Sequence, residues 1–259
     1  MGEQLYSQMF HRNVISIQAR MGPPTRRLPG KELLPVMGKP LLAYQIERLR
    51  RAGVPVVVCT PDTHEDDRII NVALASGARA LMGHGDDPPA RHLSVARQFN
   101  ASVLGFCGGD QTFVSAEHFT LAFERMAQGD CDYVRVVGLP HGLHVWAIAR
   151  WALEECAADK SRDADEIEHT GAYWDRRPER FRTVDLDMGR SSDYRLTVDT
   201  PEDFQLHRLL LEELYPRNPL FTVDDLIATL DAHPQWAALN RDIEQYYWQG
   251  AANRPQVKA

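Results

Sequence analysis

The feature that most constrains the fold is an alternation of short apolar runs with helical patterns along the first 110 residues. Runs rich in β-branched residues at 14–17 and 54–59 indicate buried strands. Between them, residues 40–52 carry apolar side chains at helical spacing, and Gly53 follows where helices commonly end. The same order continues with a helix at 62–76, a strand at 78–82 and an apolar run that ends at Cys107. This pattern is typical of a mostly parallel α/β sheet with helices on both faces.

The loop between the first strand and the first helix, residues 18–39, has an unusual charge. From His11 to Lys31 the chain has no acidic residue, whereas its net charge over 259 residues is −7. In α/β sheets such loops lie over the carboxyl ends of the strands, where ligands bind. Guanidinium and backbone N–H groups suit phosphate oxygens, so the loop favours a polyanion site. The alternative is a solvated basic loop, because basic clusters are common on surfaces. The basic residues of this stretch are Arg12, Arg20, Arg26, Arg27 and Lys31.

Three pieces of this loop resemble a known family. They read Ala-Arg-Met-Gly at 19–22, Leu-Pro-Gly-Lys at 28–31 and Leu-Pro-Val-Met-Gly-Lys at 34–39. Their order resembles the opening of the cytidylyltransferase-like nucleotidyltransferases, which include SpsF-type spore-coat polysaccharide proteins and CMP-sugar-acid synthetases. The resemblance implies a Rossmann-like, GT-A-like single domain whose loop cradles the triphosphate of CTP. The nucleotide-binding residues that it implies are Ala19, Arg20, Met21, Gly22, Arg26, Arg27, Lys31, Arg91 and Gly109.

Three of these arginines have open alternatives. Residues 23–27 are two residues longer than the matching part of typical family members, so either Arg26 or Arg27 can be the phosphate ligand. Arg91 follows the loop at 83–89, where the family places a ribose or base contact, but His92 replaces the aromatic residue that comes next in typical members. The alternative for Arg91 is a surface arginine on an amphipathic helix.

Two aspartates are the candidate metal ligands. Asp110 follows two glycines at the end of an apolar run, which leaves it free to point into the ligand crevice, although it could also be a turn or N-cap aspartate. Asp199 lies in Leu-Thr-Val-Asp-Thr-Pro-Glu-Asp at 196–203, which resembles the family's closing motif. The resemblance implies that Asp110 and Asp199 hold Mg²⁺, which prefers carboxylate and phosphate oxygens. The expected catalytic set is Arg20, Lys31, Asp110 and Asp199.

We expect the segment around Asp199 to be the end of a strand followed by a helix. Residues 197–198 have the β-branched side chains of a strand. Thr200 and Pro201 suit the N-cap and the first helical position. Asp203 would then lie in the first turn, where the helix dipole favours acidic side chains, and needs no catalytic role.

The chain between the two aspartates should select the acceptor. Family members often read Pro-x-Gly-Leu-Asp-Val-Glu-Val where residues 140–147 stand here, so His144 replaces an acidic residue. We therefore expect His144 to face an anionic acceptor. Alternatively, it is a structural histidine in a β-hairpin subregion that packs against a second subunit. Glu168 and His169 match the family's Arg-Glu-His-Val-Thr segment, whose arginine is missing here. The expected acceptor residues are Gln111, His144, Glu168 and His169.

The resemblance implies a reaction in which an acceptor oxyanion attacks the α-phosphorus of CTP and pyrophosphate leaves. Relatives that use GTP leave the base open, and a small phosphate or phosphonate, a sugar acid or a sugar phosphate could be the acceptor. A GT-A-type glycosyltransferase is a rival, because it would use an Asp-x-Asp pair, and such pairs stand at 130–132 and 185–187. A non-catalytic nucleotide-binding protein is a second rival.

Composition excludes several other classes of protein. No run approaches eighteen apolar residues and the first residues lack a signal-peptide core, so we expect a cytoplasmic protein without a membrane partner. The acidic balance argues against a nucleic-acid binder. Four cysteines form no Cys-x-x-Cys pair, so no zinc site is expected. We expect a flexible leader at 1–12, a nucleotidyltransferase domain at 13–233 and a C-terminal extension at 234–259, helical to residue 248. The resemblance also implies a homodimer.

Overall fold

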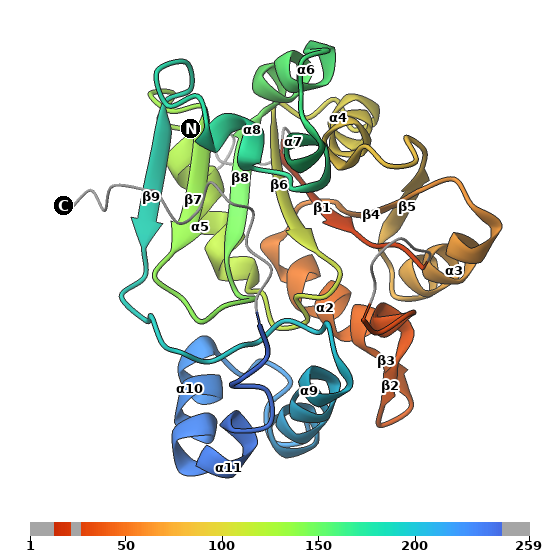
Figure 1. The fold of residues 1–259 in the computed structure, drawn as a ribbon, viewed down its shortest axis with the longest axis vertical. Helices are drawn as coiled ribbons and strands as arrows, with labels where there is room; N and C mark the ends of the chain where they lie inside the picture. The colour runs from red at the N-terminus through yellow and green to blue at the C-terminus, as the bar shows by residue number, and fades with distance from the viewer. Residues whose placement is uncertain (1–12, 22–26, 245–259) are drawn as a thin grey trace.

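A computed structural model describes residues 13–21 and 27–244 of this chain. Their centre is a seven-stranded sheet with the strand order β5-β4-β1-β6-β8-β7-β9 (Figure 1). Every neighbouring pair is parallel except the two pairs that β8 makes, with β6 and with β7. The strands are β1 (Asn13–Gln18), β4 (Val56–Thr60), β5 (Arg79–Met82), β6 (Val103–Gly108), β7 (Tyr133–Val137), β8 (Val145–Ala149) and β9 (Thr183–Asp187). The expected mostly parallel α/β sheet is confirmed.

Helices cover both faces of the sheet, because successive strand residues point to opposite sides. In β1, Ile15 and Ile17 pack into one apolar cluster and Val14 into the other. The first cluster lies under α2 (Leu41–Leu49), α3 (Asp67–Ala75), α5 (Ala116–Met126), α9 (Pro201–Leu214), α10 (Val223–Ala232) and α11 (Pro234–Ala237). The second lies under α4 (Pro88–Gln98), α6 (Arg150–Ala158) and α8 (Ala172–Asp175), with α7 (Ala164–Glu168) beside them (Figure 1).

Short elements complete the loop after β1. It continues into the single turn η1 (Lys31–Leu33), and the two-residue strands β2 (Pro35–Val36) and β3 (Lys39–Pro40) then form a small hairpin. Two other single turns, η2 (Arg50–Ala52) and η3 (His64–Asp66), end α2 and precede α3. Gly53 adopts the left-handed conformation after η2, as its position in the sequence predicted.

The segment before α9 differs from its predicted form. Thr200 and Pro201 do begin α9 as N-cap and first residue. Residues 197–198, however, are no strand, and the prediction of a strand there was wrong. The chain instead crosses the carboxyl ends of the sheet (Figure 1), where Val198 N donates to Asp110 O at 3.0 Å. Gly142 allows this crossing, because a Cβ there would lie 2.3 Å from Leu196 O.

The predicted helix at 234–248 was correct at its start and wrong in its length. The helix α11 ends at Ala237, and residues 238–242 form turns and a bend, while the predicted range beyond residue 244 lies outside the described residues, as does the expected leader. Asn240 gives the physical reason, because its buried side-chain amide donates to Arg195 O at 3.0 Å and to Asp203 Oδ1 at 2.8 Å. These bonds turn the chain towards the start of α9. In the described ranges no helix has the length and apolar content to cross a membrane.

Two buried histidines should make the fold sensitive to acid. Burial lowers the pKa of His92 to about 3 and that of His207 to about 4. As the pH falls below 6.5, histidines of the unfolded chain become protonated, whereas His92 and His207 stay neutral in the folded protein. The free energy of unfolding therefore decreases. Above pH 6.5 these histidines are neutral in both states, so they no longer lower the free energy of unfolding. We predict that His207→Gln reduces this pH slope by up to about 1.4 kcal/mol per pH unit.

Urea denaturation at a series of pH values measures the slope, and His64→Gln is the matched control, because the His64 side chain is 99 % exposed. An unchanged slope in the His207 variant would contradict the prediction.

Candidate active site

A cleft of about 1200 Å³ opens at the carboxyl ends of β1 and β6. These neighbouring strands form the point where the chain order of the sheet reverses, which is where α/β sheets bind ligands. One half of the cleft is lined by the loop after β1 and the loop after β6, and the other half by the β7–β8 connection and the segment around α7.

At the junction of the two halves, Lys31 lies between two carboxylates. Its Nζ donates to Asp110 Oδ2 at 2.8 Å and to Asp199 Oδ1 at 2.7 Å. The ammonium is almost buried, with the side chain 9 % exposed. Burial alone would lower the pKa of Lys31, but Asp110 and Asp199 outweigh it and raise the pKa. The expected catalytic residues Lys31, Asp110 and Asp199 are therefore brought together.

Asp199 is held from behind by a buried polar cluster. Arg195 donates to Asp199 Oδ2 at 2.6 Å and to Asp203 Oδ1 at 2.9 Å, and Asp199 N donates to Asp203 Oδ2 at 2.9 Å. Burial would raise the pKa of Asp199, yet Lys31 first and then Arg195 and Arg27 hold it below its usual value. Asp203 thus does more than begin a helix. Sequence reasoning missed Arg195 and Asn240, although the spacing of Arg195 four residues before Asp199 was a signal.

Asp110 is placed by the close approach of two loops. Gly109 N donates to Gln18 O at 2.7 Å, and a Cβ at Gly109 would lie 3.0 Å from Ala19 Cβ and 3.1 Å from Glu32 Cγ. Only glycine fits this approach without movement, so Gly109 serves the site through its backbone. Ala19 is buried at the same contact.

The arginines of the loop after β1 lie at the rim of the cleft. Arg27 Nη2 lies 3.5 Å from Asp199 Oδ2, and Arg20 Nη1 lies 3.4 Å from Asp86 Oδ1. Both arginines line the cleft. Met21 N donates to Asp66 Oδ1 at 2.7 Å, which anchors the loop. Gly22 and Arg26 lie outside the described residues.

Arg91 is fully buried, so the surface alternative was wrong. Its Nη1 donates to His84 O at 2.9 Å and also to Gly85 O, which ties α4 to the loop that precedes it. Burial lowers the pKa of Arg91. Its Nε and Nη2 are buried with no hydrogen-bond partner among the described residues. The neighbouring His92 lines the cleft.

The predicted acceptor residues all line the second half of the cleft. Gln111, however, uses both ends of its amide on the backbone: Oε1 accepts from Gly108 N at 2.6 Å, and Nε2 donates to His144 O at 3.1 Å. It therefore shapes the connection that carries His144. Glu168 and His169 follow at the end of α7.

Sequence reasoning missed three residues on the floor of this half, Tyr133, Arg135 and Trp146. Arg135 donates to Asp175 at 2.7 Å and to Asp185 at 2.7 Å, so its charge is balanced by two carboxylates. The Trp146 ring stacks on Phe106 with centroids 5.4 Å apart. Alternation along strands β7 and β8 was the only sequence signal for these positions.

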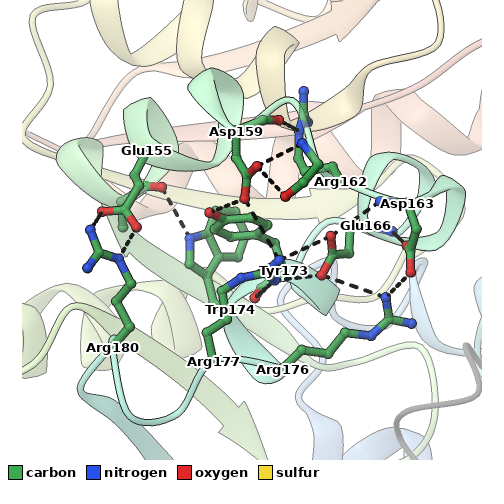
Figure 2. A network of polar contacts seen from close by, with 12 residues as sticks. Glu155, Asp159, Arg162, Asp163, Glu166, Tyr173, Trp174, Arg176, Arg177 and Arg180 are labelled. Atoms are coloured by element: carbon green, nitrogen blue, oxygen red, sulfur yellow. Dashed lines mark hydrogen bonds and ion pairs between the residues drawn. The ribbon is translucent and has the colours of Figure 1, made fainter.

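A network of ion pairs holds the outer wall of the acceptor half (Figure 2). Arg176 pairs with Asp163 at 2.7 Å, and Arg177 pairs with Glu166 at 2.5 Å, so α7 is fastened to α8. Asp163 also caps α7 in a capping box with Glu166. Arg162 donates to Asp87 at 2.7 Å, which joins this wall to the N-cap of α4. The two halves of the cleft are thus physically linked.

The donor set at the junction fits a divalent cation. Asp110 and Asp199 already hold one cationic group between them, and Mg²⁺ is commonly bound by one or two carboxylates together with substrate phosphates. Among residues 13–21 and 27–244, no group of three or more His, Cys, Asp or Glu side chains is placed to hold a metal without other ligands. The site therefore suits an ion that shares its coordination with a phosphate.

Comparisons with known proteins agree with this fold. The spore coat polysaccharide biosynthesis protein SpsF of Bacillus subtilis is 27 % identical over 237 residues, which cover 88 % of this chain and 97 % of that protein. A solved cytidylyltransferase from Leptospira borgpetersenii superposes with a TM-score of 0.81 at 26 % identity, and the match covers 91 % of this chain and 99 % of that one.

Two more distant structures share the fold. The CMP:2-keto-3-deoxy-manno-octonic acid synthetase, solved in complex with CTP, gives a TM-score of 0.61 at 21 % identity over 78 % of this chain and all of that one. The protein Rv0371C of Mycobacterium tuberculosis, solved in complex with manganese, gives 0.53 at 20 % identity with the same two shares. The family model described as cytidylyltransferase matches residues 14–222. The chain is a member of the cytidylyltransferase family.

Proposed function

We propose that this protein transfers the CMP group of CTP to a small anionic acceptor and releases pyrophosphate. The observation that carries the proposal is the position of Lys31 between Asp110 and Asp199, at the foot of a cationic loop and at the junction of the two halves of one cleft. This arrangement offers carboxylates for a divalent ion and cations for a triphosphate side by side.

The first half of the cleft is the proposed nucleotide site. Arg20, Arg27 and Lys31 would neutralise the triphosphate, and Arg27 lies 3.5 Å from Asp199, whereas Arg26 lies outside the described residues. Arg91 is fully buried and does not line the cleft, so it would support the nucleotide site indirectly, by holding the loop at His84 and Gly85 in place. A relative solved with CTP supports cytosine as the base.

Asp110 and Asp199 would hold Mg²⁺, which, when bound, stabilises charge on the α-phosphate and on the leaving pyrophosphate. The chain's own residues orient the reactants. Arg195 and Asp203 fix Asp199, and the backbone of Gly109 fixes Asp110. Little covalent chemistry is asked of the protein, so positioning and charge neutralisation supply most of the rate.

The second half of the cleft is the proposed acceptor site. The side chains of His144 and His169 are cationic or neutral donors there, and Arg135 is already balanced by Asp175 and Asp185. These donors support a small phosphate or phosphonate, a sugar acid or a sugar phosphate as the acceptor. Gln111 would act by holding the backbone of Gly142 and His144 in place.

The glycosyltransferase rival is weakened by the positions of the Asp-x-Asp pairs. Asp132 pairs with Arg182 at 2.7 Å, and Asp185 pairs with Arg135 at 2.7 Å. In the part of the chain that the structure describes, none of the four aspartates lines the cleft. A metal that served a nucleotide sugar would therefore need Asp110 and Asp199, which stand in the family's own pattern.

Pyrophosphate release is the direct test. We expect release from CTP, and not from UTP or ATP, with Mg²⁺ and one member of a panel of sugar acids, sugar phosphates and small phosphonates. Asp110→Asn should lose about 3–4 kcal/mol of transition-state stabilisation, on the order of a hundred- to a thousandfold in rate. Asp130→Asn is the control, because Asp130 is exposed and pairs with Arg125 outside the cleft. Near-normal turnover in the Asp110 variant, or sugar-nucleotide hydrolysis without pyrophosphate release, would contradict the proposal.

Arg195 is predicted to be a positioning residue. Arg195→Met leaves Asp199 and Asp203 without their buried partner, so we expect a loss of about 3–5 kcal/mol in the free energy of unfolding. Calorimetry of CTP binding with Mg²⁺ and with EDTA should show that the metal-dependent gain in affinity is lost, and that Arg195→Lys restores part of it. A stable variant that keeps the full metal-dependent gain would contradict the positioning role.

A further inference from the structure

The two carboxylates at the junction of the cleft are paired with cations of the protein itself. Asp199 accepts hydrogen bonds from Lys31 at 2.7 Å and from Arg195 at 2.6 Å, and Arg27 lies 3.5 Å away. Asp110 accepts a hydrogen bond from Lys31 at 2.8 Å. Behind them, Asp203 accepts a hydrogen bond from Arg195 at 2.9 Å. With the buried Glu32, whose charge also acts on Lys31, four carboxylates face three cations, so the protein's own cations offset most of the negative charge at the junction.

The Lys31 ammonium lies where a divalent ion shared by the two carboxylates would have to lie. Its Nζ is within hydrogen-bond distance of one oxygen from each aspartate. Mg²⁺ binds oxygen at about 2.0–2.1 Å, so an ion shared by the same two oxygens would overlap the ammonium. The ion and the ammonium thus compete for one position, and a free ion would also meet the charge of Arg195 and Arg27.

The geometry of Lys31 allows it to leave this position. It is the first residue of η1 and follows Gly30, whose φ of 66° places the turn. The four-carbon stem of lysine lets its ammonium pivot without movement of the backbone. Arg27 lines the same cleft, and the proposed triphosphate site lies beside it. The Lys31 ammonium could move to that site when the triphosphate is bound.

We propose that Lys31 is an internal counter-ion, which fills the divalent-ion position in the nucleotide-free protein and yields it only when a triphosphate takes over the ammonium. This inference rests on the proposed nucleotide site. If Lys31 has this role, the metal ion and the nucleotide bind together, and the metal ion alone binds weakly. Lys31 also keeps Asp110 and Asp199 from repelling each other while the site is empty of ligands.

Mn²⁺ is a suitable probe, because it favours the same octahedral oxygen ligands as Mg²⁺ and its free form gives an electron paramagnetic resonance signal. We expect the wild-type protein to bind Mn²⁺ at this site at least about tenfold more weakly without CTP than with it. Lys31→Met should bind Mn²⁺ alone at least about tenfold more tightly than the wild type, and Mn²⁺ alone should raise its Tm. The double variant Lys31→Met with Asp110→Asn should lose this gain, which assigns it to this site.

Lys39→Met is the matched control. Lys39 also pairs with a carboxylate, that of Glu47, and with Tyr215 Oη at 3.1 Å, but it does not line the cleft described here. Lys39→Met should therefore bind Mn²⁺ as the wild type does. If Lys31→Met does not fold, Lys31→Gln, which keeps hydrogen-bond donors without the charge, and the wild-type comparison with and without CTP still test the inference.

Two outcomes would overturn the counter-ion role while leaving the proposed function intact. One is Mn²⁺ binding to the wild type that is equally tight with and without CTP. The other is a folded Lys31 variant that binds Mn²⁺ no more tightly than the wild type. Failure of the wild-type protein to bind CTP with any divalent ion would instead overturn the proposed function, and the inference with it.

Discussion

The ion pairs from Lys31 to Asp110 and Asp199 join three segments that are far apart in the chain, at separations of 79 and 168 residues. The cation between the two part-buried carboxylates stabilises both, because burial penalises each charge and the two acids repel each other. The loop after β1, the end of β6 and the segment before α9 therefore depend on one another.

The sheet provides the frame for this contact. Parallel pairing of β1 with β6 brings the loop with Lys31 beside Asp110, since both loops leave the same edge. Strand β7 brings the chain to that edge and the antiparallel strand β8 leaves from it, so the connection with Gly142 lies where the segment before α9 crosses. That crossing delivers Asp199. The buried cluster of Arg195, Asp203 and Asn240 then fixes its direction.

Sequence reasoning succeeded where local signals were strong. The strand at β1, the helix that ends at Gly53 and the N-cap at Thr200 all follow from short-range patterns. The family motifs located Lys31, Asp110 and Asp199, which the structure brings together. Membership of the cytidylyltransferase family was also predicted correctly from these motifs.

The failures share one cause, which is competition from contacts distant in sequence. A helix pattern continued past Ala237, but the side-chain amide of Asn240 donates hydrogen bonds to Arg195 and Asp203, which lie 45 and 37 residues away in the sequence. Residues 197–198 have strand propensity, yet their segment crosses the carboxyl ends of the strands, where it makes an isolated bridge from Arg195 to His141 and single bonds such as that from Val198 N to Asp110 O. Arg91 sits on an amphipathic helix and resembles a surface residue in sequence, although the fold buries it beneath the loop at 83–87. No local pattern carries such information.

A crystal structure with CTP and Mn²⁺, in which anomalous scattering locates the ion, tests the roles of Asp110, Asp199 and Lys31 directly. We predict an anomalous peak between Asp110 and Asp199, with the Lys31 ammonium moved onto the triphosphate. A peak elsewhere, or Lys31 still between the two carboxylates with nucleotide bound, would contradict these roles.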